Sequence, residues 1–298
     1  MVKELSLSYF IKKRETEQLR GYCIDKNTEK ITEFFQEIEN KKAKEQNRMP
    51  STVFVENIDG FMYMDDEFIP EYNAIYIYFK ESRDAPDIYK SFVHEEKHAL
   101  QFHLSNRDVD ELSQFDKELT IAHKLSFYYN IDDDSNHPAI QYLYNFNELD
   151  SKVDEAKELL AFIQNDIDNI DRYKGVLRDM LQFCEIYNKQ GLKEYQSWLI
   201  KHCGTYYKNP KKDPYGIIQS VINAENKLNI DIKKFISNTL CDLCKDKYIQ
   251  LIHIRKDLNK LFAITKQEPE KRVSLIEKYK QKEMKIQNRE NMNIDTER

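Results

Sequence analysis

Residues that interrupt helices are scarce in this chain. Its 298 residues include 6 Gly, 7 Pro and 1 Trp. Lys, Glu, Asn, Ile and Leu are abundant instead, and a chain with few helix breakers and many helix-forming residues favours helix over sheet. We therefore predict an α+β fold that is predominantly α-helical.

Long hydrophobic runs are also missing. No stretch approaches the ~18 consecutive apolar residues that a membrane-spanning helix requires, so no membrane span is predicted. The first residues, Met1 to Ser6, lack the apolar segment and cleavage site of a secretory signal, which favours a cytoplasmic protein. Export by a system that reads no N-terminal signal would leave the same sequence.

Excess positive charge and a disulfide framework are absent as well. The formal net charge is −6, and no basic stripe is interleaved with aromatic residues, so nucleic acid is not an expected partner. An odd number of cysteines, 5, is typical of reduced thiols rather than of a secreted disulfide scaffold. We interpret Cys241 and Cys244, a lone CxxC, as buried helical cysteines. Nothing in the sequence indicates an oligomeric state.

What the chain does contain is the pattern His94-Glu95-x-x-His98. Residues four apart lie on one face of an α-helix, so both imidazoles can reach one zinc ion. Glu95 is rotated by ~100° from His94, which places it near a metal-bound water as a general base rather than a ligand. The alternatives are a helix whose histidines are merely packed or solvent-facing, and a former enzyme that has lost its metal.

The residues around this motif predict the helix that carries it. Asp84 provides an N-cap and Pro86 is tolerated in the first turn, so we expect a helix from about Pro86 to about Leu104. Apolar residues recur in it at steps of three and four, which predicts a buried face beside the two histidines.

A small antiparallel sheet is predicted just before this helix. Residues 52–55 and 61–64 read as strands joined by a turn at 57–60, and residues 73–79 read as a third strand. An exposed edge of such a sheet can hold an extended peptide through main-chain hydrogen bonds.

The remaining segments read as helices, and the chain divides into four parts. We expect one or two helices within 5–44, one at 108–130, and a long helical run at 138–190. An acidic turn at 132–134 separates the last two. Shorter helices follow at 192–202, 214–228, 231–245 and 246–263. The parts are a helical segment at 1–50, a zincin-like domain at 51–190, a helical region at 191–267, and a charged tail at 268–298 that is disordered or a free helix.

A catalytic zinc needs a third protein ligand. The favoured donor is Glu148, in Asn147-Glu148-Leu149-Asp150-Ser151, 50 positions after His98. Asp150, Asp154 and Glu155 are rival ligands in the same stretch, and Glu148 could instead be a surface acid of an amphipathic helix.

The two motifs together resemble the gluzincin-type zincin metallopeptidases, especially bacterial sequences with HExxH-Ala-Leu-Gln. The resemblance covers roughly residues 52–157 and implies His94, His98 and Glu148 as zinc ligands and Glu95 as the catalytic base. The chain departs from the usual pattern by having Ser151 in place of alanine. It also has Lys152 where an aspartate is common four residues after the glutamate.

The resulting functional prediction is a zinc metalloendopeptidase that hydrolyses a peptide or protein. Zinc lowers the pKa of its bound water toward ~7, and Glu95 takes the proton and later delivers it to the leaving amine. Tyr142, Tyr144 and His137 are possible stabilisers of the transition state, and no substrate is indicated. The competing prediction is a non-catalytic helical interaction protein or a degenerate zincin.

Overall fold

A computed structural model describes residues 11–58, 65–80, 82–107, 113–130, 138–202, 223, 226 and 231–296. Most of these residues are helical, and the strands among them form one three-stranded sheet. The prediction of a predominantly helical α+β fold is therefore confirmed at that level. Among the described residues, no helix is both long and apolar enough to cross a lipid bilayer.

The N-terminal part forms two helices, α1 (Lys13–Ile24) and α2 (Thr28–Glu45). The side chain of Asn27 caps α2 by accepting a hydrogen bond from Lys30 N at 3.0 Å, which satisfies one of the free N–H groups of the first turn. The face of α2 that is buried carries Ile31, Phe34, Phe35 and Ile38. The expected helices within 5–44 are therefore present as a pair.

The sheet is mixed, and its strand order is β1-β3-β2. β1 (Thr52–Asn57) pairs parallel with β3 (Ala74–Phe79), whereas β2 (Glu67–Ile69) pairs antiparallel with β3. The predicted antiparallel sheet is thus wrong for the β1–β3 pair. The chain reverses direction between β2 and β3, where Asn73 adopts a φ of 47°, so β1 meets the opposite edge of β3 in parallel.

Strands β1 and β3 lie where the sequence predicts them, and β2 does not. β3 is buried along nearly its whole length, as expected for a central strand, whereas β1 alternates between buried and exposed positions. β2 has only 3 residues, too few for a clear alternation. The predicted strand at 61–64 and the second half of its turn, residues 59–60, lie outside the described residues.

Side chains of α2 cover the outer edge of β1. Gln36 Oε1 accepts a hydrogen bond from Val53 N at 2.8 Å, and Gln36 Nε2 donates to Ser51 O at 2.9 Å. Thr32 Oγ1 accepts from Val55 N at 3.2 Å. Polar groups of a helix thereby take the place of a neighbouring strand along this edge.

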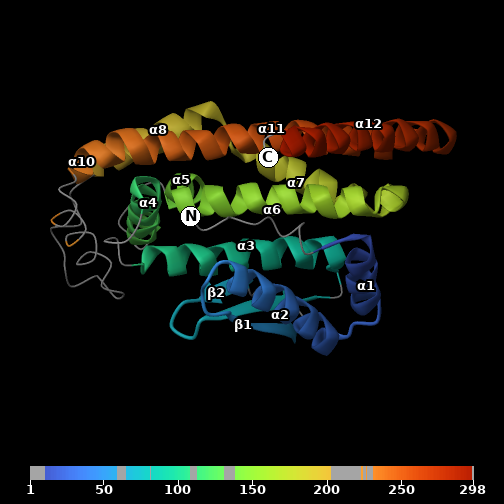
Figure 1. The fold of residues 1–298 in the computed structure, drawn as a ribbon, viewed down its shortest axis with the longest axis horizontal. Coiled ribbons are helices and arrows are strands. Elements are labelled where there is room, and N and C mark those ends of the chain that lie inside the picture. Colours follow the sequence, from blue (N-terminus) through green and yellow to red (C-terminus); the bar gives the residue numbers. More distant parts are fainter. Residues whose placement is uncertain are drawn as a thin grey trace.

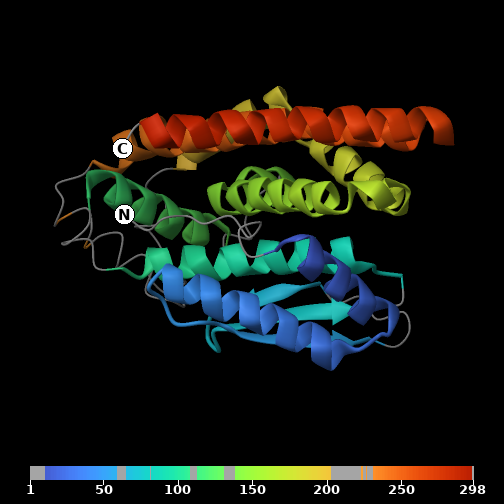
Figure 2. The ribbon, with the colours of Figure 1, turned by 45° about the vertical axis from the view of Figure 1, so that its right-hand side comes forward.

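Three layers of helices are stacked above the sheet (Figures 1 and 2). The first is α3 (Ala85–Ser105), the second is α6 (Phe146–Asn165), and the third contains α11 (Cys241–Thr265) with α12 (Pro269–Thr296) beyond it. α3 and α6 run antiparallel. Tyr89 near the start of α3 donates to Glu158 late in α6, and Gln101 near the end of α3 donates to Asn147 O early in α6.

The long helical run predicted at 138–190 is broken into several elements. They are α5 (Pro138–Tyr144), α6, a 3-10 helix η2 (Ile167–Tyr173) and α7 (Lys174–Ile186), followed by α8 (Lys189–His202). Asn145 starts α6 because its side chain accepts from Asn147 N and donates to Ser126 O on α4 (Gln114–Asn130). Asp166 ends α6 and is held there by Arg20 and Tyr173. Polar residues with tertiary partners therefore set both boundaries.

The C-terminal helices differ from the prediction in their division and in their attachment. α10 (Ile232–Phe235), the π-helical η5 (Ile236–Leu240) and α11 follow one another directly, so the predicted break between residues 245 and 246 is wrong. α12 contacts the earlier helices through a hydrogen bond between Gln164 and Tyr279 at 2.7 Å and an ion pair between Asp168 and Lys280 at 2.6 Å.

Several expectations have no counterpart in these elements. The acidic turn at 132–134 and most of the helix predicted at 214–228 lie outside the described residues. The predicted domain boundaries at residues 50, 190 and 267 stay predictions.

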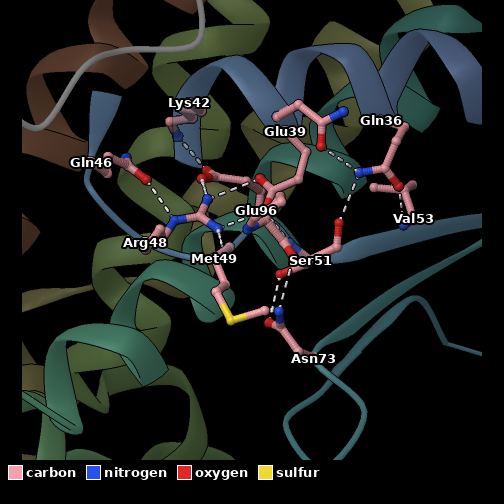
Figure 3. Close-up of polar contacts among 12 residues, drawn as sticks. Gln36, Glu39, Lys42, Gln46, Arg48, Met49, Ser51, Val53, Asn73 and Glu96 are labelled. Atoms are coloured by element: carbon pink, nitrogen blue, oxygen red, sulfur yellow. Dashed lines mark hydrogen bonds and ion pairs between the residues drawn. The ribbon is translucent and has the colours of Figure 1, made fainter. Parts of the chain in front are cut away.

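A buried group of four charges, which we call the α3 clamp, fixes α3 against α2 (Figure 3). It consists of Glu39, Lys42, Arg48 and Glu96, and Arg48 contacts both carboxylates, at 2.6 Å and 2.7 Å. Lys42 forms the other ion pair with Glu96. Glu39 also accepts from Ser51 N at 2.7 Å, which ties the start of β1 to the same group. The two positive and two negative charges of this group thus balance. One of them belongs to Glu96, the residue that follows Glu95.

We expect Arg48→Met to lower the free energy of unfolding by about 3–5 kcal/mol, because it leaves two buried carboxylates with one cation. Urea denaturation measures this change. The matched control is Lys41→Met on α2, which removes an exposed ion pair with Glu37 and should change stability by about 0.5 kcal/mol or less. Equal effects of the two substitutions would contradict a stabilising role for the α3 clamp.

Candidate metal centre

Helix α3 brings His94 and His98 to one point, as their spacing predicts. Asp84 caps the helix by accepting from Asp87 N at 3.3 Å, and Pro86 lies in the first turn. The predicted apolar face is buried, so α3 is held over most of its length. The Nε2 atoms of His94 and His98 lie 3.0 Å apart.

Helix α6 places Glu148 opposite the two imidazoles. Glu148 lies in the first turn of α6. The residue is 3% exposed, so this acid is not a surface group. Oε1 lies 3.4 Å from His98 Nε2, and Oε2 lies 3.6 Å from His94 Nε2. One ligand atom from each of the three residues therefore falls within 4.8 Å of the others.

The rival acids face other partners. Asp150 is 3.1 Å from Lys97 and also pairs with Lys247, and Asp154 is 2.9 Å from Lys97. Glu155 lies on the far side of the His94 ring, 3.3 Å from Nδ1. Of the four acids considered from the sequence, Glu148 is the one that approaches both Nε2 atoms.

A buried amide fixes the orientation of the His98 ring. Gln101 Nε2 donates to Asn147 O at 3.0 Å, which turns Gln101 Oε1 toward His98 Nδ1 at 2.9 Å. An amide oxygen only accepts, so Nδ1 carries the proton and the lone pair of Nε2 is left for a cation between His98 and Glu148. Ser151, where alanine is usual in the related pattern, lies 3.4 Å from the same Nδ1.

Glu155 takes a comparable position beside His94. Its carboxylate contacts His94 Nδ1 and pairs with Lys152 at 2.7 Å. A carboxylate behind a metal-binding imidazole orients the ring and raises its basicity. The related pattern has an aspartate four residues after the glutamate, where this chain has Lys152. The acid beside His94 is instead Glu155, about one turn after Lys152 in α6.

Burial and charge set the protonation states of His98 and Glu148. Burial lowers the pKa of His98 to about 4, although Glu148 opposes the shift. Burial alone would raise the pKa of Glu148, but the nearby His98 and His94 outweigh it and lower that pKa to about 2. A neutral imidazole and an ionised carboxylate are the forms that coordinate metals.

The pKa values of His94 and Glu95 are both raised, unlike those of His98 and Glu148. Burial and Lys152 would lower the pKa of His94, but Glu148 and Glu155 outweigh them and raise it to about 9. Burial, with a contribution from Glu148, raises the pKa of Glu95 to about 8. The carboxylates thus attract positive charge to this point, and a proton and a metal ion compete for it.

The three residues fit a divalent cation in spacing and in the chemistry of their donor atoms. Tetrahedral bonds of about 2.0–2.1 Å place ligand atoms about 3.3 Å apart, close to the distances of 3.0, 3.4 and 3.6 Å found here. Glu148 Oε2 is buried without a hydrogen-bond partner. At neutral pH the raised pKa of Glu95 keeps that acid protonated, so Glu148 and Glu155 exceed Lys152 by one negative charge, two minus one, and the proton on His94 balances it. A metal ion bound here would displace that proton.

A cleft of about 490 Å³ opens beside these residues. His94 and Glu95 lie in it, and its walls include Asp65 ahead of β2, Tyr142 of α5 and Phe183 of α7. A small ligand or a peptide segment can therefore reach Glu95.

Two of the residues considered as transition-state stabilisers can be placed. Tyr142 lines the cleft, and burial together with Glu148 raises the pKa of its hydroxyl. Tyr144 instead belongs to the core, where it donates to Asn188 O at 3.0 Å. His137 lies outside the described residues. Cys241 and Cys244 are buried, as expected from their helical context.

Comparison of the chain with protein-family models, with curated proteins and with solved structures found no match. Membership of the gluzincin-type zincins therefore stays a prediction.

We expect His98→Ala and Glu148→Ala each to reduce the zinc content of purified protein well below one ion per chain, because each removes one of three donors. Mass analysis of the metal measures it. Glu185→Ala is the control and should keep the wild-type content, since Glu185 is an exposed acid of α7 that pairs with Arg255. Normal zinc content in the Glu148 variant would exclude Glu148 as a ligand.

Proposed function

We propose that this protein is a zinc-dependent metallopeptidase in which His94, His98 and Glu148 hold the metal and Glu95 is the general base. The observation that carries the proposal is that ligand atoms of His94, His98 and Glu148 lie close together. Glu95, which is not one of these ligands, lies in the adjoining cleft. An open cleft at this point gives a substrate access to Glu95.

Bound zinc would supply Lewis acidity, which polarises a carbonyl group and acidifies a water molecule. The remaining steps belong to the side chains. Glu95 accepts a proton from the attacking water and returns it to the leaving amine. A hydrogen bond to Gln101 holds the His98 imidazole in place, and Glu155 lies 3.3 Å from His94 Nδ1 on the side away from the ligand atoms.

The sheet favours a peptide as the substrate. α2 covers the outer edge of β1, and β2 is the other edge strand of the described sheet. Asp65 and Asp66 immediately precede β2 and line the cleft. An extended peptide added to β2 by main-chain hydrogen bonds would lie next to Glu95.

The competing function is a non-catalytic helical interaction protein, which needs neither a metal nor a base in a cleft. Copurified zinc near one ion per chain, and chelator-sensitive cleavage of a mixed peptide pool, favour the peptidase. Protein that binds no metal favours the interaction protein.

We expect Glu95→Gln to abolish hydrolysis of the peptide pool, by about a hundredfold or more, while zinc content is unchanged. The amide cannot accept the proton, yet the three ligands remain. The control is Asp179→Asn, which removes an exposed carboxylate from the same cleft and should retain near wild-type turnover. Undiminished turnover in Glu95→Gln would remove Glu95 from the mechanism.

A further inference from the structure

Behind the His98 ring, a chain of buried polar groups continues through α3 and α6. Gln101, which is fully buried, accepts from His98 Nδ1 and uses its own Nε2 to donate to Asp150 Oδ2 at 3.1 Å. Asp150 is 2% exposed, so its charge must be compensated inside the protein.

The compensation comes partly from the third helical layer. Lys97 of α3 lies 3.1 Å from Asp150 Oδ2, and Lys247 of α11 forms an ion pair with Asp150 Oδ1. The Lys247 side chain is 16% exposed, and α11 runs alongside α6 (Figure 1). The two oxygens of Asp150 therefore face different helices, with Gln101 and Lys97 sharing one of them.

Lys247 is the cation that faces the second oxygen of Asp150. Lys97 lies between the two carboxylates, 3.1 Å from Asp150 and 2.9 Å from Asp154, and Lys157 lies 3.8 Å from the other oxygen of Asp154.

Without the charge of Lys247, Oδ1 of the buried Asp150 would lose the ammonium group that it faces. Asp150 would then turn to bring Oδ1 toward Lys97, which would weaken its contact with Gln101. The amide that orients His98 would be held less firmly, by Asn147 O and Ser151 Oγ without Asp150.

We propose that Lys247 is a positioning residue for the metal centre, acting through Asp150 and Gln101 on the orientation of the His98 ring. This inference rests on the proposed metal site. It assigns α11, more than 140 positions after His98 in the sequence, a part in metal binding.

Cobalt(II) as the probe metal tests the inference, because its visible absorption reports ligand geometry. We expect Lys247→Met, which keeps the aliphatic stem, to raise the cobalt dissociation constant about tenfold or more and to change the spectrum. Lys247→Arg should restore both. The matched control is Lys245→Met, an exposed lysine of α11, which should leave both unchanged.

A double-mutant cycle tests the route. If Lys247 acts through Gln101, then Lys247→Met should add little to the effect of Gln101→Leu on cobalt affinity, whereas independent effects would add. Each variant is assayed below its melting transition, which circular dichroism gives.

The outcomes separate the two proposals. Wild-type protein that binds neither cobalt nor zinc removes the proposed function. Wild-type protein that binds cobalt, with a Lys247→Met variant of equal affinity and spectrum, overturns the inference alone. Additive effects in the cycle, or loss of binding that only follows loss of folded protein, overturn it as well.

Discussion

The antiparallel contact between α3 and α6 is the constraint on which the rest of the molecule depends. Charged and polar side chains meet across it at intervals along both helices: His98 with Glu148, Lys97 with Asp150 and Asp154, and His94 with Glu155. Burying any of these charges without a partner costs several kcal/mol. A shift of α3 against α6 by one turn, about 5.4 Å, would separate the pairs and leave charges buried without partners. Their pairing fixes the register, and the register creates the candidate site.

The sequence predicted the parts of the site that one helix determines, and it missed those that depend on this register. The spacing of His94 and His98 is enough to place both imidazoles on one face of α3. Glu148 could be nominated, but choosing it over Asp150, Asp154 and Glu155 required the rotation of α6 about its axis. Gln101 and Glu155 had available signals, since they lie three and seven residues from His98 and Glu148 on the same helix faces. Neither spacing says which partner a side chain meets.

The fold was predictable to a similar depth. Hydrophobic patterning located β1, β3 and α3, because burial there follows the local sequence. The parallel pairing of β1 with β3 did not follow, since it depends on where the chain reverses near Asn73. The boundaries of α6 also escaped prediction, because Asn145 and Asp166 bond to residues from distant parts of the chain.

The covered edge of β1 has a consequence for the behaviour of many copies of this protein in solution. Unpaired strand edges invite aggregation, because a second molecule can extend the ladder. Gln36 and Thr32 occupy Ser51 O, Val53 N and Val55 N, which are groups that such a molecule would need at β1. β2 is only 3 residues long and carries the exposed acids Asp65 and Glu67 at its start, which repel an identical edge. Both edges of the sheet are thereby protected against pairing with a second copy of the protein.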